Sequence, residues 1–261
     1  MEYRTARMKD FLTRARYAAA SPFSRSFSAK RRWLAEREDW EGLGIAQTAM
    51  RRKVYVVPRT GAVCIAVSKC ANTTLKYMLY PEGKVEPRGV HADDHLLTRL
   101  IDAGLTLNDL LDGSRGVFTF VRHPVSRFWS CYTTRIHNAD PRSRMVAKIA
   151  RHMGIEPRSD FSPELVLDYV RSQSPVVVDE HLRPLWSCTG IEKLPTTFVG
   201  RIETMAQDLG RLLDMGYFDK GHLSRFRHLN QSAKTELPGQ ARIDPKIREV
   251  YAKDMELFGY D

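Results

Sequence analysis

Two stretches of the sequence share one pattern: a short apolar run, a small polar loop, and then apolar residues at helical spacing. The first is VCIAVSKCANTTLKYMLY, residues 63–80, and the second is FTFVRHPVSRFWSCY, residues 118–132. Short apolar runs bounded by polar loops are typical of buried strands. Strands that alternate with helices predict an α/β fold with a mainly parallel central sheet flanked by helices.

The loop of the first stretch suits the binding of an anion. A strand that leads into a helix through small residues presents backbone N–H groups at the helix start, where the helix dipole also favours negative charge. The candidate contacts are Lys69, Cys70, Ala71, Asn72, Thr73, Thr74 and Lys76. An ordinary β–α turn with a capping Asn or Thr is the alternative, because the P-loop pattern G-x-x-x-x-G-K-[ST] is absent.

The second stretch carries a similar set of residues. Arg122 is expected where the strand ends, which is the usual place for ligand contacts in an open α/β sheet. Arg127 and Ser130 lie three residues apart on a predicted helix, so they share a face. An arginine and a hydroxyl that point to one place can hold a phosphate. A helix whose Arg and Ser meet only solvent is the alternative.

The remainder of the chain predicts a basic helical segment over residues 1–50 and a single domain over residues 51–261. The expected elements of that domain are a hairpin of residues 53–57 and 63–67, short helix 107–111, a mostly loop region 138–160, helix 163–171 capped by Ser162, an irregular segment 179–186, strand 196–199, helix 203–215, a basic loop 221–242 and a final helix opened by Asp244 and Pro245.

Charge and cysteine content restrict the partners and the compartment. The formal net charge of +10 predicts a polyanionic partner or a multiply phosphorylated cofactor. The four cysteines show no CxxC pairing, which predicts free thiols in a reducing compartment and no zinc site. No apolar run approaches the roughly 20 residues that span a bilayer. We therefore expect a cytoplasmic protein, with peripheral membrane contact through the basic N-terminus as a hypothesis.

Five segments, taken in order, resemble one family. They are SKCANTTLK (68–76), FTFVRHPVSRFWSCY (118–132), DEHLRPLWSC (179–188), FVGRIETMAQDL (198–209) and YAKDMELFGYD (251–261). This order resembles the PAPS-dependent carbohydrate sulfotransferases, in the branch that includes the chondroitin and dermatan sulfotransferases, over roughly residues 60–261. The sequence departs from the family pattern at His123, where Asp is usual, and at Leu182, where an aromatic residue is usual.

The resemblance implies a P-loop-like sulfotransferase fold and the transfer of a sulfuryl group from PAPS to a hydroxyl of a carbohydrate or glycolipid, leaving PAP. It implies that the loop of residues 68–76 holds the 5′-phosphosulfate, with Lys69 neutralising charge on the leaving oxygen, and that Arg122 and Ser130 hold the 3′-phosphate. Arg225 and Ser232 lie in a basic loop that is expected to close over the nucleotide. No metal is needed, because lysine and backbone amides supply the positive charge.

A histidine is the expected general base, since its ordinary pKa of about 6.5 suits proton transfer near neutral pH. The resemblance favours His91, whereas His95 and His181 are rival candidates. His95, His181 and Arg183 are also candidates for binding the acceptor.

Two other function classes are open alternatives. A P-loop-like kinase would need a Walker lysine and a Mg²⁺-binding carboxylate, and neither pattern is found. A basic nucleic-acid-binding protein fits the charge, but no RRM, zinc finger or basic heptad is present, so we expect no nucleic-acid partner. The many arginines of residues 135–158 point to an anionic acceptor, although a solvated loop would have the same composition.

Overall fold

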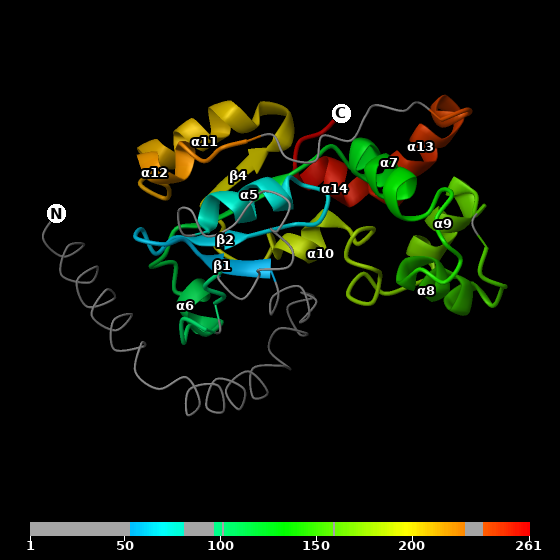
Figure 1. Ribbon diagram of the computed structural model, residues 1–261, viewed down its shortest axis with the longest axis horizontal. Helices are drawn as coiled ribbons and strands as arrows, with labels where there is room; N and C mark the ends of the chain where they lie inside the picture. The colour runs from blue at the N-terminus through cyan, green and yellow to red at the C-terminus, as the bar shows by residue number, and fades with distance from the viewer. Residues whose placement is uncertain (1–52, 81–96, 101, 159, 228–236) are drawn as a thin grey trace, which may run out of the picture.

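The computed structural model describes residues 53–80, 97–100, 102–158, 160–227 and 237–261, and a four-stranded β-sheet lies at its centre (Figure 1). In spatial order the strands are β1 (Val54–Val56), β2 (Val63–Ile65), β3 (Val117–Val121) and β4 (Phe198–Arg201). β1 is antiparallel to β2, whereas β2 with β3 and β3 with β4 are parallel pairs. The predicted α/β fold with a mainly parallel sheet is confirmed, although β4 begins two residues later than expected.

The helices of the described residues connect and flank these strands. They are α5 (Asn72–Leu79), α6 (Asn108–Leu111), α7 (Pro124–Arg135), α8 (Arg144–Met153), α9 (Pro163–Arg171), α10 (Leu185–Thr189), η3 (Ile202–Thr204), α11 (Met205–Asp214), α12 (Lys220–Leu223), α13 (Gln240–Val250) and α14 (Ala252–Leu257). Within this part of the chain, no helix is long and apolar enough to cross a membrane.

The sheet is buried on both faces, as is usual for parallel strands. Cys64 and Phe118 point to the face that packs against α5 and α11. Their neighbours Val63 and Val117 point the other way and pack with the residues of and around α6. This alternation follows from the two-residue period of a strand, and it leaves the ends of the strands, rather than their faces, for ligand contacts.

A second hydrophobic core lies beside the sheet. It is formed mainly by α7, α8, α9 and α13, which we call the helical part (Figure 1). Trp129 on α7 donates from its indole nitrogen to Asp244 on α13 at 2.7 Å, and the hydroxyl of Tyr132 donates to the carbonyl of Phe161 at 2.7 Å. These bonds fix α7, which also carries Arg127 and Ser130, against its neighbours.

Residues 138–160 were expected to be mostly loop, and this prediction is wrong because α8 lies within them. Ser143 caps the helix by accepting a bond from Val146 N, and Gly154 ends it with a left-handed φ of 66°. Met145, Val146, Ile149 and Ala150 are buried at helical spacing. The many arginines of this segment lie on the exposed side, so composition concealed the apolar face.

The start of the last helical region was also predicted wrongly. α13 begins at Gln240, directly after Gly239 with φ 80°, and continues through Pro245. Asp244 does not open the helix but lies within it, and its carboxylate accepts the bond from Trp129. A proline inside a helix removes one backbone hydrogen bond. α13 nevertheless continues through Pro245, and it packs against α7 and α9.

Candidate active site

Two loops meet at one edge of the sheet. Ile65 at the end of β2 pairs with Thr119 of the parallel strand β3, and the Thr119 hydroxyl donates to the Ile65 carbonyl at 2.8 Å. The carboxyl ends of parallel neighbours lie at the same edge. The lysine loop, residues 68–71, and the arginine loop, residues 122–123, are therefore neighbours, as the sequence predicts.

The lysine loop turns tightly although it contains no glycine. Lys69 and Ala71 have φ angles of 67° and 54°, in the left-handed region. This backbone costs roughly 1–2 kcal/mol for each non-glycine residue, and such residues are concentrated at functional sites. Ala71 is the N-cap of α5 and provides no side-chain cap. The start of α5 thus keeps the positive end of a helix dipole with no acidic residue in its first turn.

Lys69 links this loop to α7. Its ammonium group donates to the hydroxyl of Thr134 at 2.6 Å, and that hydroxyl donates in turn to the Ser130 carbonyl at 2.7 Å. Burial lowers the pKa of Lys69, and the positive charges of Arg135 and Arg122 lower it further. A lysine surrounded by arginines is a place where an anion is electrostatically favoured.

Arg122 follows β3 directly and is half-buried. Among the described residues its guanidinium makes no hydrogen bond and no ion pair, and burial lowers its pKa. Ser130 is buried on α7, and its hydroxyl has no hydrogen-bond partner in the same described set. A half-buried cation and a buried hydroxyl without protein partners fit a site for an oxyanion.

Asn72, at the start of α5, carries an unpaired polar atom of the opposite kind, which accepts hydrogen bonds and does not donate them. Its side-chain carbonyl oxygen is buried and has no hydrogen-bond partner in the described part of the chain. An unpaired buried acceptor costs free energy, so a donor that comes from a ligand would relieve this cost. An oxyanion has no such donor, so the role of Asn72 as an anion contact stays a prediction.

The other residues predicted to bind the cofactor differ in how deeply they are buried. Cys70 is fully buried and packs in the core near β3 and α10. Thr73 is half-buried and Thr74 is buried in the first turn of α5. Lys76 is buried with its ammonium 5.5 Å from the centre of the Tyr55 ring, beneath the helix. Arg225 donates to the carbonyl of Tyr80, just after α5.

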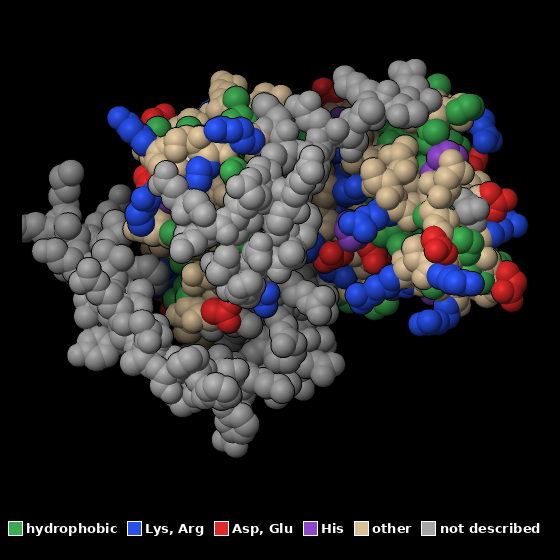
Figure 2. Space-filling model, in the orientation of Figure 1, with side chains coloured by type: hydrophobic (Ala, Val, Ile, Leu, Met, Phe, Trp, Pro, Cys, Tyr) green, Lys and Arg blue, Asp and Glu red, His purple; other side chains and the backbone are tan. Residues whose placement is uncertain are grey.

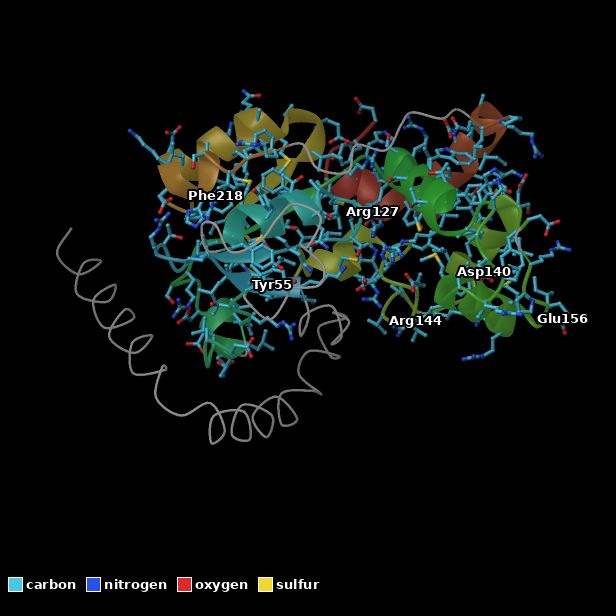
Figure 3. All side chains as sticks on the ribbon, viewed as in Figure 1. Tyr55, Arg127, Asp140, Arg144, Glu156 and Phe218 are labelled. Carbon is cyan, nitrogen blue, oxygen red and sulfur yellow. The ribbon has the colours of Figure 1, made fainter. Side chains whose placement is uncertain are left out.

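Arg127, which the sequence places near Ser130, has a different task. Its guanidinium is buried and donates to the carbonyls of Ser68 at 3.1 Å, Arg183 at 2.7 Å and Glu180 at 3.1 Å. Figure 3 shows Arg127 where the sheet meets the helical part. Three of its five N–H groups therefore hold the lysine loop to residues 180–183, and the side chain is buried there.

Residues 179–183 carry charged groups to the same junction. His181 and Asp179 form a pair, with the imidazole Nδ1 2.8 Å from the carboxylate. Glu180 pairs with Lys53 at 3.0 Å, and Lys53 also donates to the Ser68 hydroxyl. On the face drawn in Figure 2, basic, acidic and histidine side chains gather where the sheet meets the helical part. Lys53 was not identified from the sequence, because a lysine before a strand has no distinguishing pattern.

Arg183, a predicted substrate contact, is buried. It donates to the carbonyls of Pro175 at 3.1 Å, Val176 at 3.0 Å and Val178 at 2.8 Å. These bonds shape the segment before it, whereas its Nη1 is buried without a hydrogen-bond partner among the described residues, and the role of Arg183 as a substrate contact stays a prediction. His91, His95 and Ser232 lie outside the described residues.

The arrangement can bind a ligand that carries two separated anionic groups. One group would meet Lys69 and the start of α5, and the other would meet Arg122 and Ser130. The acidic groups at this junction have partners of their own: the Glu180 carboxylate pairs with Lys53, Asp179 pairs with His181, and Glu203 accepts from the backbone N–H of His123. In that same part of the chain, no group of His, Cys, Asp and Glu side chains has the geometry of a metal site.

Comparison with known proteins adds one match. The model of a family described as "Sulfotransferase family" matches residues 52–261. No curated protein and no solved structure matches the chain. The matched range contains every described element and both loops of the site.

Proposed function

The chain belongs to the sulfotransferase family, and from this premise we propose that it transfers a sulfuryl group from PAPS to a hydroxyl of a carbohydrate or glycolipid. The observation that carries the proposal is that Lys69, Arg122 and α7 come together at one sheet edge, where the Arg122 guanidinium and the Ser130 hydroxyl have no hydrogen-bond partner among the described residues. PAPS has a 5′-phosphosulfate and a 3′-phosphate, which are two anionic groups at a fixed separation. We assign this activity to a domain of residues 51–261.

The proposed contacts divide between the two phosphates. Lys69 and the backbone of residues 70–74 would hold the 5′ end in a P-loop-like manner, although no P-loop glycines are present. Arg122 and Ser130 would hold the 3′-phosphate. Arg225 donates to the carbonyl of Tyr80, just after α5, and this position favours a contact between Arg225 and the nucleotide. Ser232 remains a proposed contact of the same loop.

The chemistry then depends on charge placement. Bound PAPS would supply an activated sulfuryl group, whose transfer resembles phosphoryl transfer and is governed by positioning and electrostatics. The ammonium of Lys69 can neutralise the charge that develops on the bridging oxygen. The bond from Lys69 to Thr134 keeps the ammonium at the junction between the two phosphate sites.

A histidine is proposed to take the proton of the acceptor hydroxyl. We retain His91 as the favoured base, with His95 and His181 as rivals. The pairing of His181 with Asp179 at 2.8 Å strengthens the case for His181, because a carboxylate that holds one imidazole nitrogen orients the other.

The acceptor is proposed to be anionic. Arg144 and Arg151 on α8 are exposed, and neither forms an ion pair among the described residues. They leave a basic surface on the helical part that would favour an acidic glycan or lipid headgroup. The four cysteines are free, which supports our proposal of a cytoplasmic location, and we keep contact of the basic N-terminus with membranes as part of that hypothesis.

The first test is the thermal stability of the protein with and without PAP. A ligand that binds only the native state raises the melting temperature, so we expect a clear rise with PAP and a smaller one with ATP. Arg122→Ala should lose most of the rise, because a hydrogen bond to a charged group contributes about 1.5–3 kcal/mol. Lys69→Ala should lower the rate of sulfuryl transfer more than it lowers the affinity for PAP.

Arg144→Ala is the matched control, since Arg144 is exposed on α8. It should bind PAP as the wild type does. Equal shifts with PAP and ATP, or an Arg122→Ala variant that still binds PAP normally, would contradict the proposal. Sulfuryl transfer that continues in the presence of EDTA would distinguish this protein from a kinase, which depends on Mg²⁺.

A further inference from the structure

A cluster of three side chains lies immediately beside Arg122, and no motif of the sequence assigned it a role. His123 follows Arg122 after β3, Glu203 lies in η3 after β4, and Tyr260 follows α14. One oxygen of the Glu203 carboxylate accepts from the His123 backbone N–H at 2.9 Å. The other oxygen accepts from the Tyr260 hydroxyl at 3.3 Å.

The Tyr260 ring is held from two sides. The guanidinium of Arg201 lies 4.8 Å from the ring centre and donates to the carbonyls of Phe258 at 2.7 Å and Gly259 at 3.0 Å. The His123 ring packs edge-on, with 5.1 Å between ring centres. Such contacts orient an aromatic ring, so the hydroxyl has a fixed direction toward Glu203.

The His123 ring contacts the backbone through both of its nitrogens. Its Nδ1 accepts from Val125 N at the start of α7, and its Nε2 lies 3.3 Å from the Asp261 carbonyl. The histidine thus caps α7 where the family pattern has an aspartate, and it adds no negative charge next to Arg122.

The contacts of Glu203 determine whether its charge can pair with Arg122. The negative charge of Glu203 acts on Arg122, and its carboxylate contacts the neighbouring residue His123, yet Arg122 and Glu203 form no ion pair among the described residues. Both carboxylate oxygens of Glu203 are already engaged by His123 and Tyr260. Burial, followed by the charge of Glu203, raises the pKa of Tyr260, so the hydroxyl remains a donor at neutral pH.

We propose that Tyr260 is a positioning residue for the 3′-phosphate site: its hydroxyl holds Glu203 away from Arg122, so that Arg122 stays available to a phosphate. This inference rests on the proposed function. Without the hydroxyl, one oxygen of Glu203 would be free to pair with Arg122 and would compete with the phosphate for the same guanidinium.

The test compares the affinity of the full chain for PAP and for adenosine 5′-phosphate, which lacks the 3′-phosphate, by calorimetry. Tyr260→Phe should weaken PAP binding by about tenfold, which corresponds to about 1.4 kcal/mol, and leave adenosine 5′-phosphate binding unchanged. The double variant Tyr260→Phe, Glu203→Gln should recover wild-type PAP affinity, because the competing charge is gone. Tyr217→Phe removes a tyrosine hydroxyl bonded to Thr197 and should behave as wild type.

Each result decides the inference. Equal losses for both nucleotides would give Tyr260 only a structural role, and an unchanged PAP affinity would give it none. Failure of the double variant to recover would exclude competition by Glu203. A wild-type protein that does not prefer PAP over adenosine 5′-phosphate would overturn the proposed function as well, and this result is distinct from the others.

Discussion

At the scale of single residues, Asp179 shows how the site is linked to acid stability. Burial opposes its ionisation, but hydrogen bonds from the ring and the backbone of His181 outweigh burial and lower the pKa from 3.8 to about 2. A carboxyl group whose pKa is lower in the folded state stabilises the fold above its unfolded pKa. This contribution is therefore present above about pH 4 and is lost as the pH falls toward 2.

We expect Asp179→Asn to remove about 2 kcal/mol of the free energy of unfolding at pH 7, from the shift of nearly two units. The difference from wild type should shrink as the pH falls to 2. Urea unfolding at a series of pH values measures it. Asp168→Asn, at an exposed position of α9, is the control, and a pH-independent difference for Asp179→Asn would contradict the expectation.

Single residues also mark where reasoning from the sequence succeeded and where it could not. Lys69 and Arg122 lie where the sequence placed them, each after a recognisable buried strand, while their roles in binding stay predictions. Arg127 was expected to face a phosphate, but it binds the carbonyls of Ser68, Glu180 and Arg183. Its partners lie more than 50 positions away in the chain. No local pattern specifies such a contact, because it depends on how α7 packs.

At the scale of elements, α10 depends on a carboxylate from another helix. Asp254 on α14 is buried and accepts from the backbone N–H groups of Leu185 at 2.7 Å and Trp186 at 2.9 Å. These are orphan donors of the first turn of α10, which has no side-chain cap of its own. The contact joins α14 to the segment that carries Asp179 and His181.

We expect Asp254→Ala to cost about 2–5 kcal/mol in the free energy of unfolding, because two buried N–H groups lose their acceptor. Burial raises the pKa of Asp254 to about 6, so its stabilising contribution is largest below about pH 4 and decreases as the pH rises through 6. The difference between variant and wild type should thus be larger at pH 5 than at pH 8. Glu256→Ala, exposed on the same helix, should show neither effect.

Elements were predicted well where a cap and a regular apolar pattern agreed. Ser162 and Pro163 correctly marked the start of α9, and β3 has the bounds read from its apolar run. α8 was missed although Ser143 and Gly154 frame it, because its high charge obscured the buried stripe. α13 was misplaced because tertiary packing overrode the local preference of proline for a helix start.

At the scale of the whole molecule, Arg127 joins the two cores. It belongs to the helical part, and its donors reach the lysine loop beside the sheet and residues 180–183. Lysine has the same charge but cannot make three bonds in the planar arrangement of a guanidinium. Arg127 therefore helps to fix the placement of the lysine loop relative to α7, and with it the separation of the two proposed phosphate sites.

We expect Arg127→Lys to lower the free energy of unfolding by about 3 kcal/mol, since hydrogen bonds from a charged donor contribute about 1.5–3 kcal/mol each. The PAP-induced rise in melting temperature should decrease together with stability. Differential scanning calorimetry with and without PAP measures both. Arg144→Lys, on the exposed surface of α8, should change neither, and an Arg127→Lys protein as stable as wild type would exclude the bridging role.

The left-handed backbone of Lys69 and Ala71 limits how far the thermal stability of this protein can be raised without a loss of turnover. Glycine at position 71 would relieve the steric cost of its φ of 54°, so a search for heat-resistant variants would favour it. The same change would let the loop adopt many shapes before its ligand arrives, and binding would have to restore the original one. Selection for durability and selection for turnover would thus act on the same residue in opposite directions.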